Sequence, residues 1–577
     1  MKQELENAVQ SAVRELYSQE VAIDFSLPEE QFGDYATNIA LQLAKQIGKS
    51  PREIGETLAV KLRETLAEQV SEVSIAGPGF INMKLTDKAL TNLLQTKPEQ
   101  TLAEKSIVAE YSDPNPFKVL HAGHLYTSLV GDAVSRLMEA GGAQVHRVNF
   151  GGDVGRHVGM TMWAIIKELG GEHPENLVAI PDGQKLDWVS QLYVRGNEAY
   201  ETDETAKQEI IQINKQVYEL HNEDDHDSPF AQIYWTCRQW SYDGFDNLYK
   251  RLEMLPFEKY YPESTVFDVG LQTVSQHIGE VYEKSDGAVI FRGEPYGLFT
   301  QVFINSEGLP TYAAKDVGLI YKKEADFSPD QSFIFTDIAQ KDHLAVVMKS
   351  ISLYDPKLVA TTTHYTHGQI KMVGGIKMSS RKGNILRASD ILDTAAEASK
   401  KLSGKNDPEV VLAAVKYAFL KNRIGGDIIY DPAESVSLEG NSGPYLQYAH
   451  ARARSIMRKV TEDHPSERDE EPGLEEILRS TQDDASDGIT ALLPGERSLV
   501  RKLSEYSEVI DKAVAELMPH HIATYLYELA QTFNRFYENN RVIGDEREKL
   551  RLALVRQYAD TLRTGLSLLG IASPDKM

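Results

Sequence analysis

The most regular hydrophobic pattern in the chain predicts a β-strand, a turn and a helix in direct succession. Residues 106–112 (SIVAEYS) alternate in polarity and are rich in strand-forming side chains. The segment DPNPFK then carries two prolines and an asparagine, which are typical of turns. Beyond residue 121, apolar side chains recur at four-residue steps, at Leu125, Leu129, Ala133 and Leu137. Gly141 and Gly142 follow, so we expect a helix that ends there.

The same patterns divide the chain into three domains. Residues 106–400 alternate between strand and helix, which predicts a doubly wound, Rossmann-like parallel sheet with a mostly helical insertion at about 171–265. Residues 1–95 combine helices with a strand pair around GPGF, which predicts a small α+β domain. Residues 408–577 have helical periodicity almost throughout, which predicts an all-α domain. The expected fold class is therefore multidomain α/β.

Composition narrows the classes of protein that fit. With 577 residues the chain is too long for one core. The formal net charge of −25 argues against a general nucleic-acid binder. It does not exclude RNA as a partner, because Lys and Arg can gather on one face. It predicts weak non-specific RNA binding, since that affinity is mainly electrostatic.

Targeting and cysteine content point to the cytoplasm. The chain has no run of eighteen apolar residues, and its first sixteen residues form an acidic amphipathic pattern unlike a signal peptide. We therefore expect a cytoplasmic protein without a membrane partner. The single cysteine, Cys237, excludes an intramolecular disulfide and a cysteine-rich zinc site, so no zinc is expected.

The segment HAGH at His121–His124 lies where the predicted helix begins. The two histidines are three residues apart and therefore share a face, and Gly123 allows a ligand to approach the backbone. Helix N-termini favour phosphate, and imidazoles can donate to phosphate oxygens as negative charge develops. Taken alone, a His-x-x-His pair is more often structural, or half of a metal site.

A second segment, KMSSRKGN at Lys377–Asn384, holds three cations, two hydroxyls and a glycine. It follows the strand-like residues 358–365 and a glycine turn, so it can act as a basic loop that neutralises a leaving pyrophosphate. Taken alone, such a loop is usually solvated surface. The two segments together, in this order, indicate an enzyme that activates a carboxylate with ATP.

These segments resemble the HIGH and KMSKS signatures of class I aminoacyl-tRNA synthetases. Their surroundings are similar to the arginyl-tRNA synthetase family over nearly the whole chain and in the family's order. The matching stretches are FGDYATNIALQLAK, AGPGFINMKL, EYSDPNPFKVLHAGHL, NFGGDVGRHVGM, LPTYAAKDVG and NSGPYLQYAHARARSI. The resemblance implies that ATP and L-arginine give arginyl-adenylate, whose arginyl group passes to the 3′ end of tRNA(Arg), with Mg²⁺ accompanying ATP.

The resemblance also assigns residues to the reaction. It implies catalytic roles for His121, Gly123, His124, Lys377 and Lys118. It implies ATP contacts by His121, His124, Gly152, Asp153, His364, Lys377, Met378, Ser379 and Ser380.

The expected arginine contacts fit the chemistry of a guanidinium, which prefers planar carboxylate partners. Glu110 ends the first predicted strand, and Asp316 lies four residues after Tyr312 at another strand-to-helix crossing. Each carboxylate alone is more often a helix cap or part of a surface ion pair. By resemblance the arginine site comprises Glu110, Asn115, Tyr312, Asp316 and Gln340, and His343 follows the same predicted strand as Gln340.

By resemblance the helical domain reads the anticodon, the N-terminal domain touches the tRNA elbow, and the protein is expected to be a monomer. Exposed aromatic side chains beside Arg and Asn suit unpaired bases, although aromatics at helical spacing more often belong to a core. The expected RNA contacts are Phe80, Asn82, Tyr445, Tyr448, Phe533, Asn534, Tyr537 and Met577.

The chain departs from the family pattern at several positions. Ser380 replaces the second lysine of KMSKS, and Lys118 is a substitute for that charge. Phe150, Val154, Arg156 and His157 replace the usual His, Trp, Thr and Gln, and His367 replaces a usual phenylalanine. The roles of these residues stay open.

Four other functions share part of this pattern. Another class I synthetase is the nearest, although cysteinyl specificity usually brings a zinc site. A small-molecule nucleotidyltransferase would not need the helical domain. A catalytically silent tRNA-binding protein would not need His121, His124 and Lys377. A metal-dependent hydrolase lacks an evident third ligand.

Overall fold

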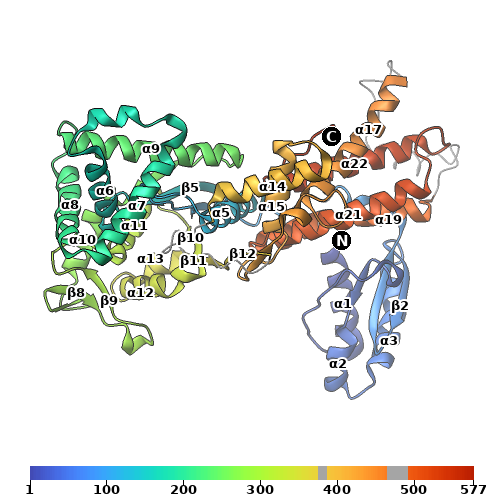
Figure 1. Cartoon of the computed structure of the whole chain (residues 1–577). Coiled ribbons are helices and arrows are strands. Elements are labelled where there is room, and N and C mark those ends of the chain that lie inside the picture. The colour runs from blue at the N-terminus through green and yellow to red at the C-terminus, as the bar shows by residue number, and fades with distance from the viewer. Residues whose placement is uncertain (374–385, 464–490) are drawn as a thin grey trace.

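The computed structural model describes residues 1–373, 386–463 and 491–577. In Figure 1 the N-terminal domain (blue) lies beneath the C-terminal helices (red). The unit expected to be catalytic, which begins at residue 106 and is called the catalytic unit below, extends to the left of both. The segment Lys377–Asn384 lies outside the described residues.

The catalytic unit is built on a sheet of five parallel strands in the order β11-β10-β4-β5-β6. The strands are β4 (Ser106–Glu110), β5 (Gln144–Gly151), β6 (Lys259–Pro262), β10 (Gln331–Asp337) and β11 (Thr362–His367). Strand β4, the first of these strands in the sequence, lies at the centre of the sheet. The chain adds β5 and β6 on one side of β4 and then crosses over to add β10 and β11 on the other side. The doubly wound sheet expected from the sequence is confirmed, and the carboxyl ends of all five strands meet at one edge.

Helices cover this sheet and extend beyond it. They are α5 (Ala122–Ala140), α6 (Arg156–Leu169), α7 (Lys185–Thr202), α8 (Glu204–Asn222), α9 (Pro229–Arg251), α10 (Phe267–Gln276), α11 (Tyr312–Phe327), α12 (Lys341–Ser352), α13 (Pro356–Thr361) and α14 (Ala388–Ser403). Helix α5 begins and ends as its sequence predicts, and fourteen of its residues are buried. Figure 1 shows α6 to α9 gathered beyond β5, at the end farthest from the other domains.

Three elements differ from the sequence expectation. Strand β6 lies inside the range expected to be an insertion, because four residues of mixed polarity give too weak a signal for an edge strand. Residues 358–361 belong to α13, so the strand expected from residue 358 begins at Thr362. A small antiparallel sheet of β7 (Glu283–Ser285), β8 (Ala288–Phe291) and β9 (Gln301–Ile304) was not expected.

The N-terminal domain packs three helices and α4 against an antiparallel sheet in the order β1-β3-β2. Its elements are α1 (Lys2–Tyr17), β1 (Tyr35–Thr37), α2 (Ile39–Ile47), α3 (Pro51–Thr65), β2 (Val70–Ala76), β3 (Phe80–Leu85) and α4 (Asp87–Leu93). The domain is held to the C-terminal helices by Asp34, whose buried carboxylate accepts hydrogen bonds from Arg497 at 2.7 Å and 3.3 Å.

In its described residues, 408–463 and 491–577, the C-terminal region is helical, as predicted, apart from one short strand. It comprises α15 (Pro408–Leu420), β13 (Ile428–Tyr430), α16 (Pro432–Ser435), α17 (Gly443–Asp463), α19 (Pro494–Ser504), α20 (Tyr506–Glu516), α21 (His520–Asn539) and α22 (Glu548–Leu568). Strand β12 (Ile370–Met372) of the catalytic unit pairs in parallel with β13. Ala133 and Leu137 of α5 belong to the same buried cluster as Leu562 and Leu566. The helix that opens at His121 is therefore packed directly on the helical domain.

Candidate functional site

The histidines of HAGH cap the N-terminus of α5. The Nδ1 atom of His121 accepts from the backbone N–H of Gly123 at 3.1 Å, and Nδ1 of His124 accepts from the N–H of His121 at 3.2 Å. A Cβ at Gly123 would lie 2.8 Å from the His121 ring, so this cap requires glycine. Two backbone donors that were expected to be free for phosphate are therefore already used by the imidazoles.

The capping bonds fix the tautomer of both rings. Because each Nδ1 atom accepts, the proton of each neutral imidazole must sit on Nε2. Burial lowers the pKa of His121 to about 4 and the pKa of His124 well below its usual value. The rings lie side by side, with centroids 3.8 Å apart. At neutral pH this arrangement offers two neighbouring N–H donors, as phosphate oxygens require.

Lys118 adds positive charge beside these donors. Its ammonium lies over the ring of Tyr193 on α7, 4.7 Å from the centroid. Burial lowers the pKa of Lys118 to about 8, although the carboxylate of Glu263 opposes that shift. Lys118 therefore keeps its charge at neutral pH, and the aromatic ring holds it next to the histidines.

The turn that leads to α5 is strained. Ser112, Asp113 and Phe117 all adopt positive φ, at 75°, 47° and 67°, although none is glycine. Such backbone is costly and persists only where its surroundings enforce it. Here the Ser112 hydroxyl lies 2.8 Å from the hydroxyl of Tyr249, and the N–H of Phe117 donates to Ser241 on α9. The inserted helix thus holds the turn in shape.

The turn is also tied to the end of β5. Asn115 Oδ1 accepts from the N–H of Gly152 at 2.8 Å, and a Cβ at Gly152 would lie 2.4 Å from that oxygen. The carboxylate of Asp153 is fully buried and is bonded to Arg238 and twice to Ser264. The Asp153 carboxylate is therefore enclosed and does not face a ligand in this conformation, and the expected contact of this residue with ATP stays a prediction.

Atypical His157 connects this region to Tyr312. Its Nε2 donates to the carbonyl of Gly152 at 2.7 Å, so its Nδ1 accepts from the Tyr312 hydroxyl at 3.4 Å. Val154 is buried in the core around α6, whereas Arg156 is exposed and lies over the ring of Tyr200. Of the unusual residues, Val154 thus belongs to the core, His157 links this region to Tyr312, and Arg156 is a surface cation.

The carboxyl edge of the sheet carries two of the predicted arginine-binding carboxylates, and they differ in accessibility. Glu110 is buried in an ion pair with Lys323, so the expectation that it faces a guanidinium directly is corrected for this conformation. Asp316 is bonded to Nε2 of His343 at 2.6 Å and stays partly exposed. Lys323 lies seven residues after Asp316 on α11, a spacing that could have indicated a shared face with it.

The remaining predicted contacts lie at the ends of β10 and β11. His364 Nε2 lies 2.7 Å from the hydroxyl of Thr336, and burial lowers the pKa of His364 to about 4. Gln340 is exposed at the start of α12. Lys377, Met378, Ser379 and Ser380 lie outside the described residues. The next described residue, Leu386, accepts a hydrogen bond at its carbonyl from the N–H of Ala122 at the start of α5.

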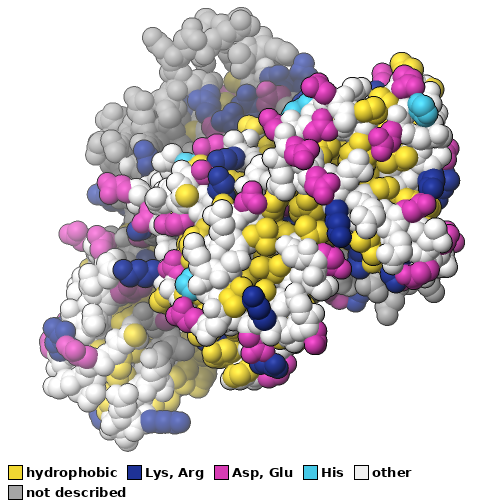
Figure 2. All heavy atoms as spheres, turned by 90° about the vertical axis from the view of Figure 1, so that its left-hand side faces the viewer, with side chains coloured by type: hydrophobic (Ala, Val, Ile, Leu, Met, Phe, Trp, Pro, Cys, Tyr) yellow, Lys and Arg dark blue, Asp and Glu magenta, His cyan; other side chains and the backbone are white. Residues whose placement is uncertain are grey.

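A cavity of about 900 Å³ opens beside Lys118 and Tyr312. Helices α6, α7 and α8 and the segment before α11 line it, and the sequence did not indicate the contributions of Tyr193 and Lys215. Figure 2 looks onto this end of the molecule, where hydrophobic side chains gather near the centre with charged ones around them. The cavity is large enough for part of a nucleotide or an amino acid.

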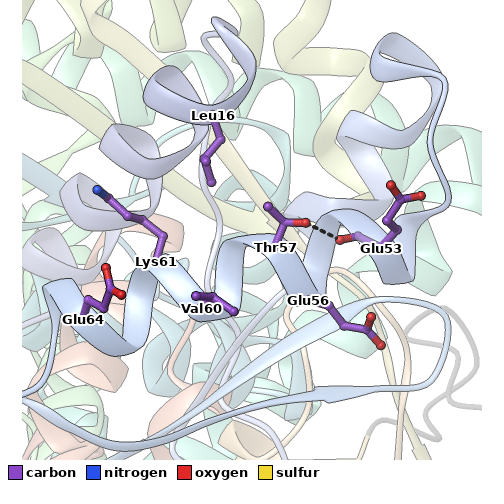
Figure 3. A pocket seen from close by; sticks show the side chains of 7 residues that line it. All are labelled: Leu16, Glu53, Glu56, Thr57, Val60, Lys61 and Glu64. Atoms are coloured by element: carbon purple, nitrogen blue, oxygen red, sulfur yellow. Dashed lines mark hydrogen bonds between the residues drawn. The ribbon is translucent and has the colours of Figure 1, made fainter.

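A second, open cavity of about 480 Å³ lies on the N-terminal domain (Figure 3). Leu16 of α1 and Val60 of α3 form its apolar part, and Glu53, Glu56 and Glu64 follow α3. Its lining residues include no histidine, so this cavity holds no counterpart of the pair at the start of α5.

The predicted RNA contacts fall into accessible and enclosed residues. Phe80, Tyr448 and Met577 are between 40% and 49% exposed. Tyr445 accepts from Asn534 at 2.9 Å, and Tyr537 lies beneath Arg452, so these three side chains are half-buried but near the surface. Phe533 is fully buried and stacks on Tyr558, and Asn82 is buried on the central strand β3. The expectation that these two contact RNA is corrected for this conformation.

Metal-binding clusters and membrane-spanning helices are both absent from the described residues. Across residues 1–373, 386–463 and 491–577, no three His, Cys, Asp or Glu side chains cluster in a way that could hold a metal ion. Among the helices in those ranges, none combines the length and apolar composition needed to cross a bilayer.

Comparison with known proteins gives concordant results. The family described as tRNA synthetases class I (R), catalytic domain, matches residues 87–433. The arginyl tRNA synthetase N terminal domain matches residues 1–85, and the DALR anticodon binding domain matches residues 446–577.

Relatives of similar length were found as well. An arginine–tRNA ligase of Cutibacterium acnes is 30% identical over 95% of both chains, and one of Flavobacterium psychrophilum is 28% identical over 99% of both. The solved arginyl-tRNA synthetase of Thermus thermophilus covers both chains completely, with a TM-score of 0.76 and 25% identity. The catalytic-domain match spans more than half of the chain, and the chain therefore belongs to the arginyl-tRNA synthetase family.

Proposed function

We propose that this chain joins L-arginine to tRNA(Arg) in two steps, through arginyl-adenylate, and that the start of α5 carries the first step. The observation that supports this most strongly is the pair of Nε2–H donors of His121 and His124, fixed by their capping bonds. ATP enters with Mg²⁺ as the substrate. The carboxylate of arginine attacks the α-phosphorus, and the bond to pyrophosphate breaks.

The histidines act on charge that grows as pyrophosphate leaves. Neutral imidazole N–H donors cost little free energy to keep buried when no phosphate is bound. Their hydrogen bonds to the phosphate oxygens become stronger as those oxygens gain negative charge. Lys118 adds a cation on the same side, and the backbone at Gly152 and the ring of His364 contact the nucleotide. By resemblance, Lys377, Met378, Ser379 and Ser380 bind the leaving phosphates. Catalysis is then positioning and electrostatics, without a covalent enzyme intermediate.

Arginine is held at the carboxyl edge of the sheet. Asp316 takes the guanidinium, because its carboxylate is partly exposed while that of Glu110 is enclosed with Lys323. Glu110 then acts indirectly: its ion pair with Lys323 holds α11, and with it Asp316, in position. Tyr312, Asn115 and Gln340 complete the site, and the bond from His157 orients Tyr312.

The outer domains hold the tRNA. Phe80 meets the elbow, and Tyr445, Tyr448, Asn534, Tyr537 and Met577 meet the anticodon region. The net charge of −25 makes binding depend on such local contacts and not on a general attraction to RNA. The chain is expected to work as a cytoplasmic monomer without zinc.

Charging of purified tRNA with radiolabelled L-arginine tests the proposal. Acid-precipitable label should accumulate with ATP and Mg²⁺, and it should disappear on mild alkaline treatment, which cleaves the ester. Absence of charging by well-folded, full-length protein with total tRNA would refute the proposed function.

A further inference from the structure

Three carboxylates near the carboxyl edge of the sheet each hold a cation. Glu110 is paired with Lys323, Glu263 with Lys315, and Asp316 with His343. The lysine side chains are 1% and 3% exposed, so they are locked in place, whereas His343 is 22% exposed. Histidine is also the only one of these three cations that can lose its charge near neutral pH. Asp316 is therefore the carboxylate whose resident cation can leave.

The geometry around His343 suits a protonated ring. Its Nε2 lies 2.6 Å from Asp316 Oδ2, and its Nδ1 lies 2.6 Å from the side-chain nitrogen of Gln301 on β9. Gln301 Oε1 is buried and has no hydrogen-bond partner. The two ends of an amide are interchangeable on geometric grounds. Turning this amide over would let Oε1 accept from an Nδ1–H, so that an imidazolium donates from both nitrogens.

The charges around the pair agree with that state. Burial lowers the pKa of His343, but the hydrogen bond and charge of Asp316 outweigh it, and the net pKa is raised. His364 on β11 and Lys341 on α12 face the same region, and the lowered pKa of His364 keeps that ring neutral. Asp113 in the turn has its pKa raised well above the usual value, by burial and by the charge of Glu110.

Two buried carboxyls are the other groups to consider. Burial raises the pKa of Glu110 although Lys323 opposes the shift, and burial raises that of Glu263 to about 7 although Lys315 opposes it. Both stay in direct contact with a buried lysine. Glu263 is thus the second group that could titrate near neutrality, and any test must separate it from His343.

We propose that His343 determines specificity by occupying the place of the guanidinium on Asp316 and that arginine displaces it with release of one proton to solvent. This rests on the proposed function, in which Asp316 binds the guanidinium. The exchange is balanced: the neutral ion pair of Asp316 carboxylate and His343 imidazolium, plus cationic arginine, gives the neutral ion pair of Asp316 and the guanidinium, a neutral imidazole and one free proton. An uncharged analogue such as citrulline cannot replace the imidazolium, because Asp316 would lose a charged partner for a neutral one.

The sign of the pH dependence follows from this exchange. Free enzyme holds the proton below the raised pKa of His343, whereas the arginine complex does not. Raising the pH from about 6.5 therefore tightens arginine binding by up to tenfold per unit, until the pKa of His343 in the free enzyme is passed. Above that value, affinity becomes independent of pH.

Calorimetric titration of the full-length protein with L-arginine, at saturating tRNA(Arg), tests the proposal. Titrations between pH 6.5 and 8.5 in phosphate and in Tris, which differ in heat of ionisation, count the protons released. We expect up to one proton at the acidic end and progressively fewer as the pH rises through the raised pKa of His343. His343→Gln should abolish both the release and the pH dependence, and citrulline should not bind.

A matched control is His146→Gln, which removes another histidine–carboxylate pair, with Glu258 at 2.7 Å, away from the site. It should behave as wild type. Wild-type binding without proton release would overturn the proposal, even if His343→Gln failed to fold. Proton release that persists in folded His343→Gln would overturn it as well and would point to Glu263.

Asp316→Asn separates this proposal from the proposed function. If that variant binds arginine normally, the assignment of Asp316 itself fails. If it binds arginine at least a hundredfold more weakly while wild type releases no proton, Asp316 keeps its role and only the displacement of His343 is wrong.

Discussion

Replacement of His121 by asparagine should slow catalysis by about 10²–10³-fold without unfolding the helix. His121 does two things with two different atoms: Nδ1 caps α5 by accepting from Gly123, and Nε2 is left as a donor. Asparagine is a strong N-cap residue, and its side-chain oxygen can reach the position of Nδ1. His121→Asn therefore keeps the cap and removes the donor, while His121→Gln keeps a nitrogen donor near Nε2 and weakens the cap.

The variants His121→Asn and His121→Gln should differ in opposite ways in catalytic rate and in stability. Loss of one donor to a developing negative charge costs about 10²–10³ in rate, or roughly 2.7–4 kcal/mol. Loss of an N-cap costs about 0.5–2 kcal/mol of stability and leaves the rate of a folded enzyme largely intact. We expect His121→Asn to show the rate loss with a thermal midpoint close to wild type. His121→Gln should show the reverse.

The assay is ATP–pyrophosphate exchange at saturating arginine and tRNA, with calorimetric binding of arginine and thermal unfolding measured on the same samples. Arginine should bind His121→Asn as it binds wild type, because the amino-acid site is separate from the donors. Wild-type turnover by folded His121→Asn would refute the reasoning. So would a rate loss in both variants that merely follows their thermal midpoints.

Three further predictions follow from the structure. Glu110→Gln leaves Lys323 buried without its charged partner and should cost about 3–5 kcal/mol of stability, which Glu110→Gln/Lys323→Met should recover. Thermal unfolding of the two variants measures this. A stable Glu110→Gln variant with impaired arginine binding would instead show that Glu110 contacts the substrate. His121 and His364 have folded pKa values of about 4, below the ordinary 6.5, so the unfolded chain binds more protons between these values. The free energy of unfolding should therefore fall as pH drops from about 6.5 to 4, less steeply in His364→Gln, and a flat profile from denaturant titrations would contradict this. A chain ending near Ser403 should lack exchange activity even with excess tRNA, because α5 loses the helices packed on Ala133 and Leu137; restored exchange would show that the helical domain only adds affinity.

The sequence was sufficient for the periodic parts of the fold. Four-residue steps from Leu125 to Leu137 and the glycines after them located α5, and the three-residue spacing put both histidines at its start. Short elements were harder to predict. The four residues of β6 have mixed polarity, and only pairing with β5 makes them a strand. Residues 358–361 are apolar enough for a strand, yet Asp355 caps them as a helix.

Side-chain partners could be predicted less well than positions. A strand end at Glu110 and a helix start at Asp316 both place a carboxylate at the sheet edge, but only the packing of α11 decides which one meets a buried lysine. Aromatic residues at helical spacing present the same problem. Phe533 and Tyr448 satisfy the same sequence pattern, and the stacking of Tyr558 from α22 puts one in the core while the other stays exposed.

The most direct test of the account is ATP–pyrophosphate exchange by the full-length protein with each of the twenty amino acids in turn, with and without tRNA(Arg). We expect exchange with L-arginine alone, and only when tRNA is present, because the family resemblance implies that bound tRNA helps assemble the amino-acid site. Robust exchange without tRNA would contradict that coupling. Exchange driven by another amino acid, or by none in the presence of tRNA, would contradict the central claim that this chain activates arginine.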